Sequence, residues 1–212
     1  MRKTIGEFGK RVMLRLIKIP AQHQRSQLFK LFLQNFNLSN ATICLDVGGV
    51  TEGFESLSKT CKAIIMNLEV RKMIEGWDLL LGDGRSLPFK DKTIDIIISN
   101  ALLEHVNKGR NELVQEIKRV SKGNYFVSVP YLYSPFDPHY LLPFFQFVPE
   151  PVKRFLLFKV GLKIGWMSKE NYDEIRLFKK SQLEELFPEA HIHLLRVFGI
   201  PTNLVALKRA HD

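Results

Sequence analysis

The sequence predicts an α/β protein with a doubly wound, largely parallel sheet, and two observations carry that prediction. Five short apolar runs alternate with helical stretches, and the runs show little of the polar alternation that a half-exposed strand has. They cover residues 41–47, 63–68, 77–81, 93–98 and 124–129. Strands covered by helices on both faces have this continuous apolar character, and alternation of strands with helices is typical of parallel sheets.

Further helices and strands are expected on either side of these runs, because apolar residues recur there at helical or strand spacing. Helices are expected over 1–20, 22–36, 111–120 and 180–186, and strands over 191–197 and 203–207. Pro20 ends the first of these helices, and Gly123 follows the third as a stop signal.

The composition is that of a globular chain with an excess of positive charge. The chain has 212 residues, of which 45% are apolar and 25% charged, and this suits one domain with a sizeable core. The net charge of +9 favours anionic partners such as nucleotides, nucleic acid or an acidic membrane surface. Two cysteines exclude a disulfide framework and a four-cysteine zinc site. No apolar run is long enough to span a membrane, and cations interrupt the start, so a cytoplasmic protein is expected.

Residues 131–166 differ in composition from the rest of the chain. This segment holds ten of the chain's aromatic residues and five of its ten prolines. It interrupts the alternation of strands and helices, so we expect an inserted, aromatic-rich helical cap that determines the substrate. The expected organisation is a single domain with four parts: N-terminal helices over 1–38, a ligand-binding core over 41–130, the cap over 131–168, and a C-terminal helix and strands over 169–212.

A glycine-rich loop follows the first apolar run. The run ends near Asp46, and Gly48 and Gly49 come shortly after it. Glycines let a ligand approach the backbone closely and tolerate positive φ. The loop does not match the Gly-x-Gly-x-x-Gly fingerprint of dinucleotide-binding proteins, because Val50 occupies the second glycine position. A carboxylate just before the glycines suits a cationic ligand group rather than a pyrophosphate, and a plain strand-to-helix turn is the alternative.

Acidic residues also end the second and third apolar runs. Glu69 follows Gly48 by about 20 residues, where an acid is placed to accept hydrogen bonds from both hydroxyls of a ribose. Asp83 is placed to accept a hydrogen bond from an exocyclic adenine amine. The ordinary alternatives are a solvated charge for Glu69 and an Asp-Gly turn for Asp83. Three acids at three consecutive strand ends nevertheless favour a ligand site there.

These motifs together resemble a known family. The segments that carry the resemblance are Leu45–Gly49, Asn67–Glu69, Gly82–Phe89 and Asp95–Val106. They resemble class I S-adenosylmethionine-dependent methyltransferases that act on small molecules, of the ubiquinone/menaquinone type. The resemblance extends over about residues 41–130, and the Leu-Pro-Phe and Leu-Glu-His elements are its most specific part.

The resemblance implies a Rossmann-like, seven-stranded sheet whose last strand is antiparallel, and S-adenosylmethionine as the cofactor. The cofactor-binding residues that it implies are Asp46, Gly48, Gly49 and Asn100 around the methionine part, Glu69 on the ribose, and Asp83 and Gly84 on the adenine. One departure matters for affinity. The family loop usually runs Asp-x-Gly-x-Gly-x-Gly, whereas Val50 and Glu52 stand at its second and third glycine positions here.

Two groups of residues are candidates for catalysis. A methyltransferase aligns its acceptor with the sulfonium methyl group, and a hydroxyl or carbon acid acceptor also needs a base. His105 is the first candidate because it follows the fourth strand at the rim of the expected site. Asp137, His139 and Tyr140 in the cap are the second. The ordinary alternative for His105 is that it serves as a partner for the neighbouring Glu104. For the three cap residues it is turn chemistry between prolines. No spacing of His, Cys and Asp resembles a metal site.

The leading functional interpretation is methyl transfer to a small or lipid-linked acceptor, because the aromatic cap suits an acceptor with an apolar or planar part. An RNA or DNA methyltransferase is the second interpretation, prompted by the charge. Ser99–Leu102 lacks the Asn-Pro-Pro-Tyr-like element of enzymes that methylate amino groups of nucleic acids, so a nucleic-acid partner is not expected. A non-catalytic binding protein is the third interpretation, prompted by Val50 and Glu52. A nicotinamide-dependent dehydrogenase is disfavoured by the loop.

A second hypothesis concerns the first twenty residues and the surface that buries their apolar stripe. An apolar stripe from Ile5 to Ile17 is flanked by six cations. The stripe must be buried against something. We favour packing of this helix over the cofactor site, and the alternative is contact with an anionic membrane surface.

Overall fold

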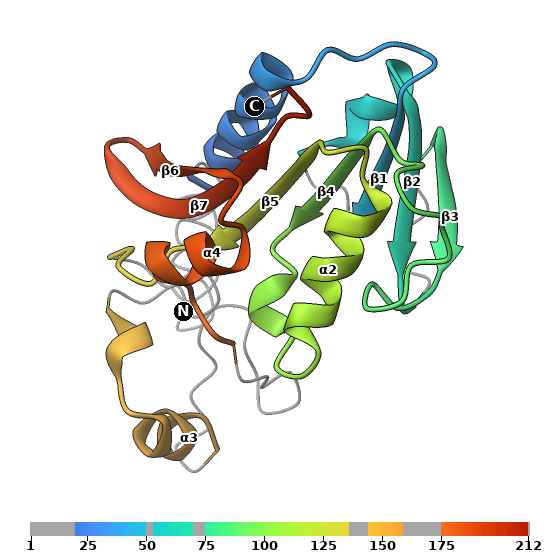
Figure 1. Ribbon diagram of the computed structural model, residues 1–212. Coiled ribbons are helices and arrows are strands. Elements are labelled where there is room, and N and C mark those ends of the chain that lie inside the picture. The colour runs from blue at the N-terminus through green and yellow to red at the C-terminus, as the bar shows by residue number, and fades with distance from the viewer. Residues whose placement is uncertain (1–19, 50–52, 70–74, 136–143, 159–174, 212) are drawn as a thin grey trace, which may run out of the picture.

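A seven-stranded sheet forms the centre of the molecule (Figure 1). The computed structural model describes residues 20–49, 53–69, 75–135, 144–158 and 175–211. The strand order is β3-β2-β1-β4-β5-β7-β6. The strands are β1 (Ile43–Val47), β2 (Lys62–Asn67), β3 (Trp77–Leu81), β4 (Ile96–Asn100), β5 (Tyr125–Pro130), β6 (His191–Val197) and β7 (Ile200–Lys208). The first five strands are parallel, as the apolar runs predict, and β7 is antiparallel to both of its neighbours, as the family resemblance implies.

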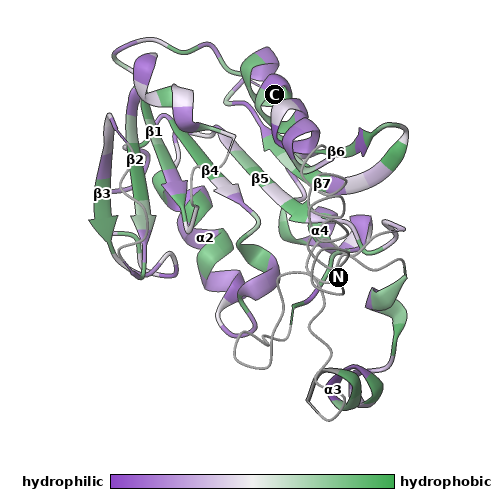
Figure 2. Cartoon of the chain, turned by 180° about the vertical axis from the view of Figure 1, so that it is seen from behind, coloured by the Kyte–Doolittle hydropathy of each residue, from purple (hydrophilic) through white to green (hydrophobic). Residues whose placement is uncertain are grey.

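Helices cover both faces of this sheet (Figures 1 and 2). One face carries α2 (Arg110–Val120) and α4 (Lys180–Leu186), and the opposite face carries a helix over residues 20–35. The remaining helical elements are η1 (Glu55–Lys59), η2 (Leu103–His105), η3 (Phe145–Phe147) and α3 (Glu150–Phe158). The expected helix over 1–20 lies outside the described residues.

Burial on both faces explains why the strands lack polar alternation. In β4, Ile97 packs into the core beneath α2, while Ile96 and Ile98 pack into the core beneath the helix over 20–35. In that second core the ring of Phe32, fully buried, meets the ring of Phe126 edge-on, with centroids 5.6 Å apart. Burying one such side chain stabilises the fold by roughly 1.5–3 kcal/mol.

The fourth strand begins later than the sequence predicts. The apolar run suggests a start at residue 93, but the strand starts at Ile96. The reason is that the N–H groups of Thr93 and Ile94 donate to the carbonyl of Val120, at the end of α2, instead of to a neighbouring strand. β7 begins earlier than the sequence predicts, at Ile200 instead of residue 203. Its hairpin with β6 is therefore longer than expected.

The sheet has two edges with different surroundings. We call the edge where β1 to β5 end the carboxyl edge and the edge where they begin the amino edge. The end of β1 at Val47, the end of β2 at Asn67 and the end of β4 at Asn100 all lie at the carboxyl edge. α3 lies on the side toward which these strands point, apart from the sheet (Figure 1). No helix in the described part of the chain is long and apolar enough to cross a membrane.

Candidate active site

The glycine loop after β1 is shaped around a buried carboxylate. Asp46 is only 1% exposed. A Cβ atom built on Gly49 would lie 1.9 Å from Oδ2 of Asp46, which is far inside van der Waals contact. Any other residue here would force the carboxylate or the loop to shift. The loop is therefore more than a plain turn that happens to contain glycine, because this glycine lies directly against a specific acid.

Gly48 is constrained in a second way. Its φ of +70° is a left-handed conformation that glycine adopts without strain, and a Cβ there would lie 2.6 Å from the side chain of Leu102. Its N–H donates to the carbonyl of Met66 at 2.7 Å. The loop is thus fitted between the end of β2 and the segment after β4.

Asn67, at the end of β2, connects the loop to the second predicted acid. Its Nδ2 donates to the carbonyl of Gly49 at 3.2 Å, and its Oδ1 accepts from the N–H of Leu68 at 2.9 Å. Glu69 follows and is exposed. The sequence analysis did not assign Asn67 a role. A polar side chain closing an otherwise apolar run was the signal for it.

Asp83 has a partner that the sequence analysis did not predict. The guanidinium of Arg85 donates to both carboxylate oxygens, with distances of 3.0 Å from Nε to Oδ1 and 2.6 Å from Nη2 to Oδ2. These hydrogen bonds hold the pKa of Asp83 below its usual value. Next to it, a Cβ on Gly84 would lie 2.8 Å from Cγ1 of Val47 and 2.9 Å from Cδ1 of Leu113. The adenine expected here would therefore meet an acid already engaged by an arginine.

The segment after β4 carries the remaining predicted residues. Asn100 ends the strand and is partly buried, and His105 ends η2 and is exposed. Between them, Ala101 has a φ of +55°, a strained conformation for a residue with a side chain. Such strain persists only where the surrounding structure fixes it, and it is common at functional sites. Asp137, His139 and Tyr140, the other catalytic candidates, lie outside the described residues.

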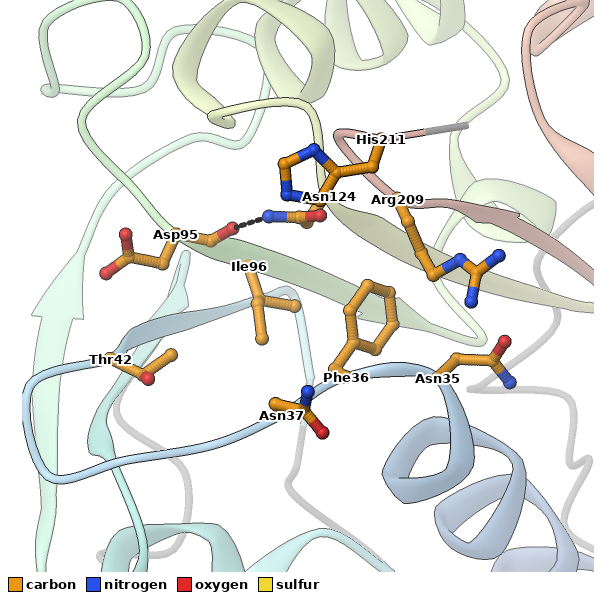
Figure 3. Close-up of a pocket in the computed structure, with 9 residues that line it drawn as sticks. All are labelled: Asn35, Phe36, Asn37, Thr42, Asp95, Ile96, Asn124, Arg209 and His211. Atoms are coloured by element: carbon orange, nitrogen blue, oxygen red, sulfur yellow. Dashed lines mark hydrogen bonds between the residues drawn. The ribbon is translucent and has the colours of Figure 1, made fainter.

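A separate cavity of about 530 Å³ opens at the amino edge (Figure 3). Its lining includes Asp95, Asn124 and the side chains of the C-terminal segment at Arg209 and His211. The polar groups here bond to one another. Nδ2 of Asn124 donates to the carbonyl of Asp95 at 2.9 Å, and its Oδ1 accepts from the N–H of Ala210 at 2.8 Å. In open parallel sheets, ligands bind outside the carboxyl ends of the strands, so this cavity is not our candidate.

Comparison with protein families gives a match over the core of the chain. Residues 45–127 match the model of a methyltransferase domain. This segment starts in β1 and ends in β5, so it holds the glycine loop and the acids discussed above. A search of curated proteins finds no significant match.

Solved structures with a similar fold include known methyltransferases. An S-adenosylmethionine-dependent methyltransferase from Methanosarcina mazei superposes with a TM-score of 0.55 at 15% identity, covering 84% of this chain and 96% of that one. Magnesium protoporphyrin IX methyltransferase from Synechocystis, with S-adenosylhomocysteine bound, gives 0.54 at 12% identity, covering 91% and 85%. Phosphoethanolamine N-methyltransferase 2 from Haemonchus contortus, with S-adenosylmethionine, gives 0.55 at 12% identity, covering 80% and 38%.

The likeness shows a Rossmann-like methyltransferase fold, and the domain match supports a class I S-adenosylmethionine-dependent methyltransferase. The predicted membership in the ubiquinone type stays a prediction. The site fits S-adenosylmethionine on one structural observation: the buried carboxylate of Asp46 lies directly against the backbone at Gly49, at the strand end where the cofactor's cationic amino group is expected. In the part of the chain that the structure describes, no three His, Cys, Asp or Glu residues are arranged to hold a metal ion.

Proposed function

We propose that this chain transfers the methyl group of S-adenosylmethionine to a small or lipid-linked organic acceptor. The observation that carries the proposal is the loop after β1, where Gly49 is required by the buried carboxylate of Asp46 and is bonded through its carbonyl to Asn67. This arrangement is at the carboxyl edge, the edge at which parallel sheets of this kind bind ligands. It also lies within the residues that match the methyltransferase domain.

We propose that neighbouring glycines compensate for the two missing glycines of the usual pattern. Gly48 has a φ of +70° and Gly53 has a φ of +91°, so glycine conformations occur on both sides of Val50 and Glu52. This favours the enzyme over a binding protein that has lost its cofactor.

The cofactor and the protein have separate roles in the proposed reaction. S-adenosylmethionine supplies a methyl group that its sulfonium already makes electrophilic. The protein then holds the two reactants in line and keeps water out, and such positioning is the larger part of the catalytic task. We propose that Asp46 accepts from the cationic amino group, Glu69 accepts from the ribose hydroxyls, and Asp83 lies near the adenine.

His105 is the proposed base for an acceptor that must lose a proton. It is exposed at the end of η2, and Asn100 and the strained Ala101 precede it along the same segment. An exposed imidazole near neutral pH exchanges protons readily. An amine acceptor would need this residue less than a hydroxyl acceptor would.

The exposed surface of the cap supports an acceptor with an apolar part. Five large apolar side chains on the described part of the cap are exposed: Tyr133, Phe144, Phe147, Val152 and Phe155. Two of these rings, Tyr133 and Phe147, stack with centroids 6.3 Å apart. Clustered exposed apolar residues mark binding surfaces more often than isolated ones do. A ring with a prenyl chain or a lipid-linked sugar suits such a surface.

Isothermal titration calorimetry with S-adenosylhomocysteine tests the cofactor part of the proposal. We expect one binding site per chain, and no heat from ATP or NAD under the same conditions. Absence of binding at millimolar S-adenosylhomocysteine would contradict the proposal and would favour the non-catalytic alternative. The acceptor part is tested by deleting the cap, which should leave this binding intact and abolish methyl transfer.

A further inference from the structure

One arginine at the carboxyl edge is placed differently from its neighbours. Arg110 is the first residue of α2, and its guanidinium carbon lies 4.8 Å from the ring centroid of Phe178. Phe178 bonds through its N–H to the carbonyl of Pro130, so it lies at the end of β5. Arg110 thus lies near the end of β5, at the carboxyl edge where the ligand is expected.

The guanidinium of Arg110 has donors without acceptors. Its Nε and Nη2 are buried, and neither makes a hydrogen bond. These two nitrogens point their N–H bonds in parallel and form the fork that binds a carboxylate or phosphate in bidentate fashion. Leaving charged donors buried and unbonded is costly, and native proteins rarely do so without a reason. Arg85, by contrast, has both its fork nitrogens on Asp83.

The charged groups around Arg110 argue against a purely structural role for this residue. Burial lowers the pKa of Arg110, and the neighbouring Arg176 lowers it further. Glu104 acts in the opposite direction but does not outweigh them. Arg176 is held beside η2, because its N–H donates to the carbonyl of Glu104 at 3.1 Å. A cation in the first turn of a helix is also opposed by the helix dipole. Two guanidinium groups and the buried carboxylate of Glu104 therefore lie close enough to influence one another, and a second anion would offset the remaining repulsion between the two cations.

We propose that Arg110, assisted by Arg176, binds an anionic group of the methyl acceptor, a carboxylate or a phosphate. The inference rests on the proposed function, because it takes the carboxyl edge as the site of methyl transfer. With the exposed aromatic surface of the cap, it specifies an amphiphilic acceptor that has an acidic group as well as an apolar part. Arg110 is half-buried as a residue, and its Nε and Nη2 atoms become reachable for an anion only when the side chains around them move.

The test uses inorganic phosphate as the probe and the Nε–H resonances of arginine side chains, observed by NMR, as the readout. Arg110→Gln removes the charged fork, and Arg196→Gln is the matched control, since Arg196 is an exposed arginine on β6 that donates to the carbonyl of Gly199. We expect phosphate to shift the Arg110 resonance in a saturable way. We expect Arg110→Gln to weaken phosphate binding about tenfold or more, and Arg196→Gln to leave it unchanged.

A second titration, with S-adenosylhomocysteine already bound, separates the acceptor from the cofactor. Phosphate binding that persists in the loaded protein supports the proposal. Competition between the two ligands would overturn it, because Arg110 would then bind the carboxylate of the cofactor. A phosphate response that is equal in the wild type and in Arg110→Gln would also overturn it. Binding of S-adenosylhomocysteine itself is measured in the same sample, so failure of the proposed function is recognised separately.

Discussion

The carboxyl edge and the amino edge belong to the same sheet, yet their polar groups are arranged differently. At the amino edge, Asp95 accepts from the N–H of Ile43 at 2.8 Å and from Nζ of Lys122 at 2.7 Å, and Asn124 joins two chain segments. At the carboxyl edge, glycines approach the buried Asp46, and Arg110 keeps an unbonded fork. The described cavity lies at the first edge, whereas the second edge has a buried carboxylate beside a glycine loop and an arginine fork without a hydrogen bond. Within the described residues, the arginine fork is thus a more specific guide to a ligand than the cavity.

This comparison predicts that substitutions at the carboxyl edge change ligand binding, and that substitutions at the amino edge change stability alone. The largest effect is expected from Gly49→Ala. Its methyl group would overlap the carboxylate of Asp46, so the loop or the acid must move. We expect the affinity for S-adenosylhomocysteine to fall by at least about two orders of magnitude, which corresponds to ~3 kcal/mol.

Gly199→Ala is the control for this substitution. Gly199 has a positive φ, and a Cβ there meets nothing within 4 Å. It should lower the melting temperature somewhat, because alanine is strained at positive φ, and leave cofactor affinity unchanged. Calorimetric affinities that are equal for Gly49→Ala and the wild type would show that the loop is not the cofactor site.

A smaller effect is expected from Glu69→Ala. The ribose hydroxyls would lose a charged acceptor, which is worth roughly 1–3 kcal/mol of binding free energy. Glu75→Ala is the matched control, because Glu75 is an exposed glutamate before β3 whose carbonyl, not its carboxylate, accepts from Ser58. Calorimetry on both variants measures the difference. Equal affinities in the two would remove Glu69 from the site.

At the amino edge, Asp95→Asn tests the other half of the comparison. Burial opposes the charge of Asp95, but the Lys122 ammonium and the N–H of Ile43 outweigh burial and place the pKa of this carboxyl below its usual value. We expect the free energy of unfolding to fall by about 1 kcal/mol at neutral pH, with no change in cofactor affinity.

The pH dependence of this effect has a definite sign. A carboxyl whose pKa is lowered on folding contributes stability above its unfolded pKa, and it loses that contribution as the pH falls through its folded pKa. The difference in stability between the wild type and Asp95→Asn should therefore be full at pH 7 and shrink toward acid. Chemical denaturation at several pH values measures it. A weaker affinity for S-adenosylhomocysteine in this variant would contradict the separation of the two edges.

The smallest change in the free energy of unfolding is expected from substitutions in the cap. Phe147 and Phe155 are 51% and 58% exposed, so replacing both by serine should change the free energy of unfolding by no more than about 0.5 kcal/mol. Cofactor affinity should not change. Binding of an apolar fluorescent dye should decrease, and Leu33→Ser, an exposed leucine outside the cap, should not decrease it as much. Equal dye binding in both variants would contradict an apolar acceptor surface on the cap.

The sequence predicted the parts of the molecule whose causes are local. The five apolar runs indicated five of the strands because the central runs are buried on both faces. The turn residues Gly48 and Gly49 indicated the loop because backbone conformation is a property of the residue itself. The start of β4 was wrong, because the carbonyl that captures its first N–H groups belongs to Val120, which is distant in sequence.

Contacts between residues that lie far apart in the chain could not be predicted from the sequence pattern. The bond from Asn67 to Gly49 depends on how two strands are paired, and the placement of Arg110 against Phe178 depends on a segment far along the chain. The ion pair of Asp83 with Arg85 is local, but the sequence pattern indicated an adenine contact or a turn there and no ion pair, because it assigns no direction to a side chain.

Hydrogen–deuterium exchange with and without S-adenosylhomocysteine tests the central claim most directly, because it reports both edges in one experiment. The account predicts that saturating ligand slows exchange in peptides covering residues 43–49, 67–69 and 82–85, at the carboxyl edge. Peptides covering 35–42 and 209–211, which line the cavity at the amino edge, should exchange at unchanged rates. Protection confined to the amino edge, or no protection at either edge under conditions where calorimetry detects binding, would contradict the account.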